Sequence, residues 1–219
     1  MLEKCEAWRL ENNVSALISF TLNAEAKEAL FLINPKYYHK TDCRGRPVYY
    51  ECLTKLSQEA LDSVADTESL FKNHIASYEV LNRIRLPACS AAAGRHIEDI
   101  CIVVDLKGLS SMKAMSMLNL MNKITSVSKD FYPEGMFKCF VINMPMLLRG
   151  LYQTFVAPLL DPATRAKTEV MGSGYASVLL QYIPKENLPA YYGGGCQCEG
   201  GCDRSDEGPW KAHFSEEAK

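Results

Sequence analysis

Several features that would assign a protein to a familiar class are scarce or missing in this chain of 219 residues. No apolar run approaches the roughly 20 residues of a membrane-spanning helix. Glu3 and Lys4 place charges where a secretory signal peptide has its apolar core. Nine cysteines among 219 residues fall well below the roughly 8–10% of a disulfide scaffold. We therefore expect a soluble, cytosolic protein whose cysteines are reduced.

An excess of charge of one sign is also missing, because 24 basic and 26 acidic side chains leave a formal net charge of −2. Binding to a nucleic-acid backbone requires a clear basic excess, so no nucleic acid is expected as a partner. Charged residues make up 23% and hydrophobic ones 47%, which excludes a disordered or fibrous chain. At roughly 150 residues per domain, the length indicates one domain, alone or with an appendage.

The sequence motifs of common catalytic sites are missing as well. We find no G-x-x-x-x-G-K-[ST], no G-x-G-x-x-G after a strand, no G-x-S-x-G and no H-E-x-x-H. Residues 105–108 have the D-x-x-G form of GTPases, but without a P-loop we interpret them as a turn that follows a buried strand. We expect a protein that is not an enzyme and that has no catalytic residues, no metal and no cofactor.

What is present is an alternation of strand-like and helical patterns. Runs typical of strands cover 48–53, 100–106, 137–142 and 168–171, and helical apolar spacing covers 67–94, 111–130, 146–160 and 175–183. The run 100–104 is apolar on both faces, as in a central parallel strand. The first forty residues are expected to form short helices ahead of the sheet. The sequence therefore predicts an α/β fold with a mainly parallel sheet.

The predicted helix over 146–160 has an unusually wide apolar stripe. One apolar row contains Leu147, Leu151, Phe155 and Leu159, and the next contains Leu148, Tyr152 and Val156. Two interpretations remain open: a buried core helix, which periodicity alone favours, and a helix that covers an apolar cavity or touches a membrane. Gly172 and Gly174 follow the segment and could form a hinge.

Short motifs, in a constant order along residues 1–211, resemble one family. They lie at 37–42, 45–49, 85–94, 105–108, 131–134, 142–145, 160–164, 183–189 and 193–210. By these motifs the chain resembles the CRAL-TRIO lipid-binding domains and, within them, the fungal phosphatidylinositol/phosphatidylcholine transfer proteins. The resemblance implies a lipid pocket with the sheet as its floor, flanking helices, and a mobile gate helix that closes it.

The resemblance also implies a domain organisation and a function. Residues 1–34 would be the remnant of an N-terminal helical lobe, 35–195 the lipid-binding domain and 196–219 a Gly- and Cys-rich tail. The gate role falls on 146–160, with the two apolar rows above as its lining. The expected protein is a cytoplasmic monomer that binds a phospholipid and contacts Golgi or endosomal membranes transiently. It would exchange phospholipid between membranes or present it to lipid-modifying enzymes.

The family's residues for the inositol phosphate fall on Thr164 and Lys167, in a D-P-x-T-x-x-K arrangement. A hydroxyl and an ammonium suit a phosphodiester, because both donate hydrogen bonds to it. A family glutamate that receives inositol hydroxyls falls on Lys123, which is a charge reversal. Judged without the resemblance, Thr164 and Lys167 would be a surface pair and Lys123 a solvated charge.

The family's choline site falls on a mixed set of residues. Its two aromatic residues fall on Tyr38 and Tyr49, which could contact a quaternary ammonium. Its serine and threonine fall on Ile100 and Ile102, which cannot donate hydrogen bonds to a phosphate, so binding of phosphatidylcholine is doubtful. Without the resemblance, these four residues would be interpreted as strand core.

Two other functions remain open at this stage. A carrier of another hydrophobic ligand, such as a sterol or an isoprenoid, would account for the departures at Lys123, Ile100 and Ile102. An α/β enzyme acting on lipid or phosphate esters is a weaker alternative, because no nucleophile or metal set is visible.

The cysteines at 196, 198 and 202 invite comparison with a zinc site. Three thiols lack a fourth ligand unless Cys5, Cys43 or His213 approaches them, and zinc sites normally pair cysteines at C-x₂₋₄-C spacing. The default interpretation is a tight Gly-Cys turn in a reducing compartment.

Overall fold

The computed structural model of the chain describes residues 2–53, 55–109, 131–132 and 134–216. Its centre is a five-stranded sheet with the strand order β1-β2-β3-β4-β5. The strands are β1 (Lys36–Thr41), β2 (Pro47–Cys52), β3 (Ile100–Asp105), β4 (Met136–Ile142) and β5 (Thr168–Val170). β1 pairs with β2 antiparallel, and the other three pairings are parallel. The predicted α/β fold with a mainly parallel sheet is confirmed.

The edge strand β1 corrects the expectation that the first forty residues form only helices. The preceding helix ends at Ile33, and its C-cap Asn34 is non-helical, as expected for the residue before Pro35, because proline disfavours helix in the residue before it. The hairpin to β2 is fixed by Asp42, whose Oδ1 accepts hydrogen bonds from the backbone N–H of Arg44 (2.8 Å) and Arg46 (2.9 Å). Gly45 takes a left-handed φ of 81° in this turn, which glycine adopts without strain.

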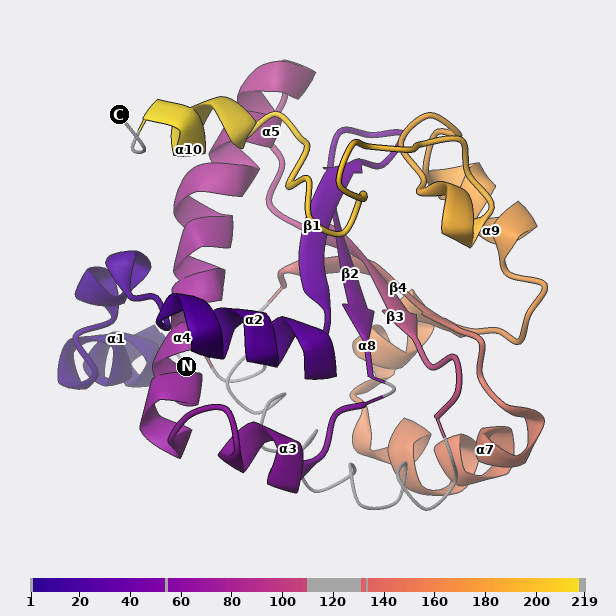
Figure 1. Cartoon of the computed structure of the whole chain (residues 1–219), viewed down its shortest axis with the longest axis horizontal. Coiled ribbons are helices and arrows are strands. Elements are labelled where there is room, and N and C mark those ends of the chain that lie inside the picture. The colour runs from indigo at the N-terminus through magenta and orange to yellow at the C-terminus, as the bar shows by residue number, and fades with distance from the viewer. Residues whose placement is uncertain (1, 54, 110–130, 133, 217–219) are drawn as a thin grey trace.

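Helices cover both faces of the sheet (Figure 1). The α-helices are α1 (Leu2–Glu11), α2 (Ala24–Ile33), α3 (Gln58–Asp62), α4 (Thr67–Val80), α5 (Leu86–Ala93), α7 (Met146–Leu151), α8 (Pro162–Lys167), α9 (Ala176–Tyr182) and α10 (Lys211–Glu216). Short turns of other helix types are η1 (Val14–Ser19), η2 (Leu81–Arg85), η3 (Tyr152–Val156), η4 (Ala157–Leu159) and η5 (Ala190–Tyr192). Within the described residues, no helix is long and apolar enough to cross a bilayer. The predicted helix over 111–130 lies outside the described residues.

Two predicted helices contain a π-helical turn before a proline. In the predicted helix 67–94, the π turn η2 joins α4 to α5, and Pro87 follows it in the first turn of α5. In the predicted helix 146–160, the π turn η3 follows α7, and Pro158 lies in the 3₁₀ turn η4. Proline lacks an N–H and its ring collides with the carbonyl four residues earlier, so the hydrogen-bond ladder changes register there. Segment 146–160 is therefore helical throughout, but only its first part is a regular α-helix.

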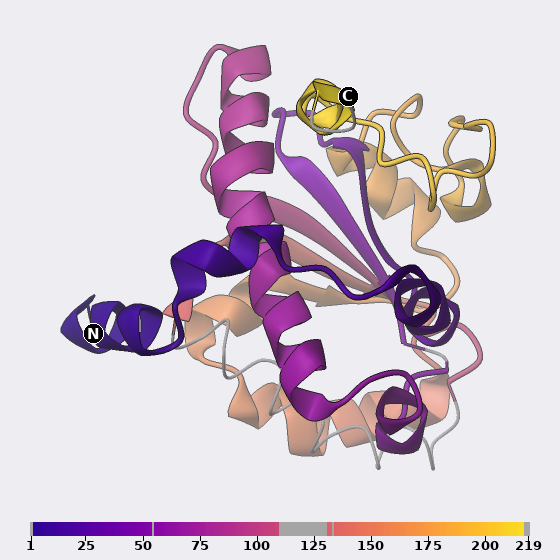
Figure 2. The same ribbon diagram turned by 60° about the vertical axis from the view of Figure 1, so that its left-hand side comes forward.

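The N-terminal turn η1 packs against α4, and α1 adjoins η1 (Figure 2). The ring of Trp8 stacks on Phe131, with 3.9 Å between centroids. The carboxylate of Glu79, 1% exposed, accepts hydrogen bonds from Arg9 (2.9 Å) and from the Tyr132 hydroxyl (2.8 Å). Arg83 lies 3.0 Å from the same carboxylate, so this buried charge is compensated from three sides.

The C-terminal tail returns to the edge of the sheet and closes the core. Trp210 is fully buried and packs with Leu81, Leu86 and Ile100 in one apolar cluster. Its indole N–H donates to Asp206 (3.0 Å), which also pairs with Arg85. The backbone N–H of Lys40 in β1 donates to the Glu207 carbonyl (2.6 Å). The tail thus contacts both β1 and the continuous helix formed by α4, η2 and α5, here called the long helix.

Candidate functional site

The two faces of the sheet differ in how completely they are covered. On one, the closed face, six side chains are 0% exposed: Val48, Tyr50, Cys101, Val103, Phe140 and Ile142. On the other, the open face, six side chains are only partly buried: Tyr49, Glu51, Ile102, Val104, Cys139 and Val141. Burial alternates along β2 and β3 because alternate residues of a strand point to opposite faces of the sheet. A mostly apolar sheet face that the described helices leave only partly buried is suited to be the floor of a ligand cavity.

The open face consists of two cross-strand rows. Register aligns Tyr38, Tyr49, Ile102, Cys139 and Thr168 in one row, from β1 to β5, and Glu51, Val104, Val141 and Val170 in the next. The first row packs at its β1–β3 end against the α4–α5 helix. The second row packs against Leu148, Leu151 and Tyr152 of segment 146–160. The open face therefore lies between the long helix and the segment predicted to be a gate.

Polar groups on the open face are held in defined states. The Glu51 carboxylate pairs with Lys36 (3.2 Å) and accepts hydrogen bonds from Asn34 (3.2 Å) and the Tyr49 hydroxyl (3.4 Å). Burial, and then the Glu51 charge, raise the pKa of Tyr49 well above its ordinary value. Burial raises the pKa of the Cys139 thiol to about 12. Both groups are therefore neutral near pH 7, and Cys139 is a poor nucleophile because it is not a thiolate.

Among the described side chains of segment 146–160, most apolar ones are at least partly buried and the polar ones are exposed, whereas Met146 is 88% exposed. Leu148 is buried, Leu151, Tyr152 and Val156 are partly buried, and Arg149, Gln153 and Thr154 are exposed. The side chains of Leu147, Phe155 and Leu159 lie outside the described part of the structure. A hollow of about 270 Å³ is lined by Arg149, Gly150, Tyr152, Gln153 and Val170. The hollow lies between the segment and the second row of the open face, because its lining includes residues of the segment and also Val170, which belongs to that row.

The start of this segment is pinned to the carboxyl ends of the strands. Asn143 has a left-handed backbone (φ 55°), and its side-chain amide donates to Asp105 Oδ1 (2.7 Å). The backbone N–H groups of Asn143 and Met144 donate to the carbonyls of Gly172 (3.3 Å) and Met171 (2.9 Å). Asp105 Oδ1 also accepts from the Lys107 N–H (2.8 Å), so residues 105–108 form the turn predicted for them.

Thr164 and Lys167 lie on one short helix, α8, beside β5. The Asp161 side chain caps this helix, accepting from the Thr164 N–H (2.9 Å) and from its hydroxyl (2.5 Å). The Lys167 ammonium lies 3.6 Å from the exposed Glu134 carboxylate. The Thr164 hydroxyl proton is thus committed to Asp161, whereas Lys167 is held only by a weak surface pair.

Tyr38 and Tyr49 contact each other, with 5.1 Å between ring centroids. The Arg85 guanidinium lies over the Tyr38 ring at 4.4 Å from its centroid. The first row of the open face spans four strand spacings from Tyr38 to Thr168, about 19 Å at roughly 4.8 Å per spacing. The structure therefore brings together each predicted pair but keeps Tyr38 and Tyr49 far from Thr164 and Lys167. Lys123 lies outside the described residues.

Ile100 and Ile102 both face the same side as Tyr49. Ile100 is 6% exposed and belongs to the cluster with Trp210, whereas Ile102 is partly buried at the centre of the first row. Sequence reasoning missed Glu51, Val104, Cys139 and Val141 as part of this face. Strand alternation predicts which residues share a face within one strand, but the register that aligns four strands depends on pairings between distant segments.

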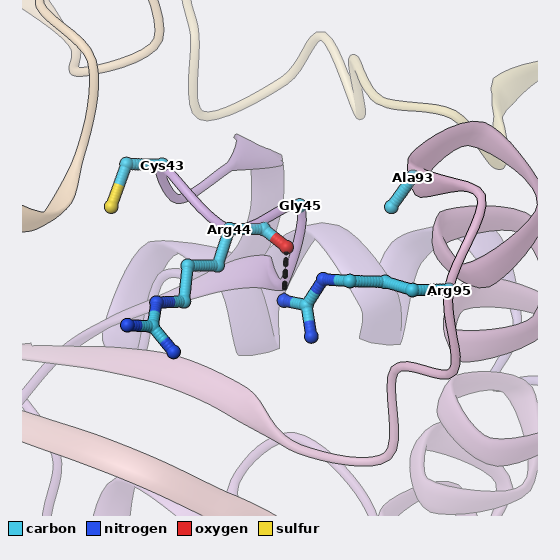
Figure 3. Close-up of a pocket in the computed structure, with 5 residues that line it drawn as sticks. All are labelled: Cys43, Arg44, Gly45, Ala93 and Arg95. Carbon is cyan, nitrogen blue, oxygen red and sulfur yellow. Dashed lines mark hydrogen bonds between the residues drawn. The ribbon is translucent and has the colours of Figure 1, made fainter.

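A second hollow, of about 580 Å³, lies away from the open face (Figure 3). It is lined by Cys43, Arg44, Gly45, Ala93 and Arg95, at the β1–β2 hairpin and the end of α5. The Arg95 guanidinium bridges the two elements by donating to the Arg44 carbonyl. With two arginines among its five lining residues, this hollow is not suited to acyl chains.

Comparison with known proteins assigns the fold and its relatives. The family model of the CRAL/TRIO domain matches residues 34–194. The chain is 42% identical over 210 residues to the Sec14 cytosolic factor of Schizosaccharomyces pombe, covering 96% of this chain and 73% of that one. It is 39% identical over 214 residues to the SEC14 cytosolic factor of Candida glabrata, covering 96% of this chain and 70% of that one.

A plant relative and a solved structure extend the comparison. The phosphatidylinositol/phosphatidylcholine transfer protein SFH9 of Arabidopsis thaliana is 35% identical over 213 residues, covering 96% of this chain and 36% of that one. The crystal structure of Sfh5 superposes with a TM-score of 0.56 at 17% identity, over 78% of this chain and 59% of that one. That likeness confirms the fold. Since the family model covers most of the chain, this protein belongs to the CRAL/TRIO domain family.

Proposed function

We propose that this protein binds a single phospholipid above the open face and transfers it between membranes, with phosphatidylinositol as the preferred headgroup. The observation that carries the proposal is the partly buried open face beside a helical segment whose side chains Leu148, Leu151 and Tyr152 pack against it. The relatives support it, since SFH9 of Arabidopsis thaliana is named a phosphatidylinositol/phosphatidylcholine transfer protein.

An apolar cavity makes lipid extraction feasible. Each methylene exposed to water costs about 0.8 kcal/mol, so two chains of about 16 carbons resist leaving the bilayer by roughly 25 kcal/mol. A cavity floored by Ile102, Val104 and Val141 returns most of that free energy. The remaining barrier is then the opening of segment 146–160, a lid motion of the kind that limits many binding cycles.

The headgroup proposal rests on α8. Lys167 is the stronger of the two candidate contacts, because an ammonium held only by an exposed carboxylate can turn to a phosphate with little loss. Thr164 would have to redirect its hydroxyl proton from Asp161 to a phosphate oxygen. Phosphatidylcholine is expected to bind more weakly, because Ile102 offers no hydrogen bond beside Tyr49 and Arg85 already occupies a face of Tyr38.

The remaining parts of the proposal concern where and how the protein acts. It would work in the cytoplasm as a monomer, contacting Golgi or endosomal membranes only while lipid is exchanged. It would act without covalent catalysis. The neutral, partly buried thiol of Cys139 on the open face supports this, since a nucleophilic cysteine needs a lowered pKa.

The test is to incubate the purified protein with vesicles that contain phosphatidylinositol, phosphatidylcholine and ergosterol. The protein is then re-isolated and its bound lipid identified by mass spectrometry. One phosphatidylinositol per chain is the expected result. A bound pool made of sterol without phospholipid would support the alternative carrier function and overturn the headgroup proposal.

Two variants separate the cavity from the headgroup contact. Ile102→Trp should fill the open face and abolish loading of any lipid, because its side chain lies at the centre of the first row. Lys167→Ala should lower loading of phosphatidylinositol about tenfold, the loss of one charge-assisted hydrogen bond, and leave phosphatidylcholine unchanged. Lys27→Ala, at an exposed position of α2, is the matched control and should load as the native protein does.

A further inference from the structure

Four side chains that can ligate a metal meet between the edge strand and the C-terminal tail. They are His39 of β1 and the tail cysteines Cys196, Cys198 and Cys202, and their ligand atoms all lie within 4.8 Å of one another. His39 is 0% exposed, Cys202 2% and Cys196 8%. The cluster lies on the closed side of the sheet, so it is separate from the open face.

Two distances within the cluster fit the edges of a single tetrahedral site. Around Zn²⁺, with Zn–S near 2.3 Å and Zn–N near 2.0 Å, neighbouring ligand atoms lie about 3.5–3.8 Å apart. The His39 Nε2 lies 3.4 Å from the Cys196 sulfur, and the Cys196 and Cys198 sulfurs lie 3.7 Å apart. Both distances therefore match edges of a zinc tetrahedron.

The backbone of the tail is shaped to turn three sulfurs toward one point. Cys196 is fixed by two backbone hydrogen bonds, to the Leu188 carbonyl (3.0 Å) and from the Ala190 N–H (2.9 Å). Gly200 and Gly201 then adopt φ values of 75° and 99°. A Cβ on Gly201 would lie 2.5 Å from an Asp203 carboxylate oxygen, so the sharp return that brings Cys202 beside Cys196 requires glycine there.

The orientation of the His39 ring is set by a second layer of hydrogen bonds. The Ser205 hydroxyl donates to the Cys202 carbonyl (3.0 Å), so its lone pair is left to accept from His39 Nδ1 (3.1 Å). A proton on Nδ1 leaves Nε2 with a lone pair directed at the sulfurs. Metal-ligating histidines are held in this way by a partner on the other ring nitrogen.

We propose that His39, Cys196, Cys198 and Cys202 bind one Zn²⁺ in a closed, structural site that fastens the C-terminal tail to the edge of the sheet. Three thiolates and one neutral imidazole form the Cys₃His set typical of structural zinc. Binding releases three protons, one from each thiol, and the filled site carries a net charge of −1. The fourth ligand is thus His39, and not Cys5, Cys43 or His213 as considered from the sequence.

The site explains why a thiol-rich tail is buried beside a strand edge. The tail also contacts the N-terminal part of the chain through the Arg204–Glu28 pair (2.6 Å), but that pair is exposed and contributes little. A metal bond from β1 to the tail would hold Trp210 in place and cover the edge strand, which otherwise offers unpaired backbone groups to other chains.

The test begins with the full chain purified under reducing conditions and dialysed against buffer without chelator. Metal analysis should find close to one zinc per chain. After removal of zinc by a chelator, titration with Co²⁺ should produce the intense visible absorption of a tetrahedral thiolate complex, saturating at one equivalent. Zinc should then displace cobalt and remove that absorption.

Variants distinguish this site from adventitious binding. Cys198→Ser changes the ligand that is least buried, so it is the least disruptive to folding, and it should weaken Co²⁺ binding at least about tenfold. Ser205→Ala should weaken it less. Cys43→Ser, which removes an exposed cysteine outside the cluster, should bind as the native protein does.

Two results would overturn the proposal. One is a reduced native protein that gives no tetrahedral cobalt spectrum, or the same spectrum in Cys198→Ser as in Cys43→Ser. The other is a metal-free protein, purified without reductant, that is two mass units lighter with Cys196 linked to Cys198 or Cys202. In that case the cluster would be a disulfide site. Neither result depends on which lipid the protein binds.

Discussion

Asn143 shows how one side chain can fix the position of a functional segment. Its backbone lies in the left-handed region, with φ 55°, two residues before Pro145 and three before the helical segment 146–160. Asparagine tolerates this conformation better than most residues because its short amide can bond locally. Here the amide donates to Asp105 at the end of β3 (2.7 Å). The segment therefore starts from a fixed point, whatever its later residues do.

Replacing Asn143 should separate the hydrogen bond from the backbone strain. Asn143→Ala loses the bond to Asp105 and keeps an unfavourable φ, so we expect a loss of about 2 kcal/mol in the free energy of unfolding. Asn143→Gly loses the bond but relieves the strain, and should cost about 1 kcal/mol less. Urea unfolding followed by circular dichroism measures both. Equal losses in the two variants would show that the left-handed φ carries no strain.

At the scale of single elements, α8 depends on its cap. Asp161 caps this six-residue helix, and the helix carries both Thr164 and Lys167. The hydrogen bonds from the Thr164 hydroxyl, and then from its backbone N–H, hold the pKa of Asp161 below its ordinary value of 3.8. A lowered carboxyl pKa means that the cap stabilises the folded state at neutral pH. Its contribution is lost as the pH falls below 3.8 and through the lower folded-state pKa.

The prediction is that α8 frays in acid earlier than its neighbours do. Amide NMR signals of Thr164 and Lys167 should shift with the protonation of Asp161. In Asp161→Asn, which keeps an acceptor but does not titrate, they should stay constant over that pH range. Asp66 caps α4 in the same manner, with its pKa lowered by Ser69, so Asp66→Asn is the control and should leave the α8 profile unchanged. A profile identical in Asp161→Asn and the native protein would contradict the assignment.

Elements also show what the sequence could and could not predict. The β-type runs at 48–53, 100–106, 137–142 and 168–171 predicted four strands to within a residue or two, because short, mostly apolar runs between turn residues are typical of strands. Apolar periodicity did not predict strand β1, because its sequence KYYHKT is largely polar. This edge strand is stabilised by its pairing with β2. The π turns before Pro87 and Pro158 interrupt helices that apolar spacing alone predicts to be regular.

At the scale of the whole molecule, long-range contacts join parts that no local pattern connects. His39 meets Cys196 across 157 positions of sequence, and Arg9 meets Glu79 across 70. The open face likewise exists only once β2, β3, β4 and β5 are in register. Composition and motifs could predict the fold and the family, whereas the grouping of His39 with the tail cysteines and most of the open face required the tertiary arrangement.

Trp210 tests how far the tail stabilises the rest of the protein. It is fully buried, its indole N–H bonds to Asp206, and its ring meets Tyr38 edge-on at 6.2 Å between centroids. Asp206 in turn holds Arg85, which lies over Tyr38. Removing the indole leaves a cavity and breaks the hydrogen bond to Asp206, which holds Arg85 over Tyr38. Trp210→Ala should therefore lower the free energy of unfolding by about 3–5 kcal/mol.

The measurement is urea unfolding followed by far-ultraviolet circular dichroism, because the substitution removes one of only two tryptophans. Trp8→Ala is the matched control. Trp8 stacks on Phe131 at the periphery and is partly exposed, so its loss should cost less than half as much. If the tail is a separate appendage, Trp210→Ala will unfold like the native protein. If instead it completes the core, Trp210→Ala will lose stability across the whole chain in one transition, and lipid loading will fall with it because Tyr38 and Tyr49 lose their support.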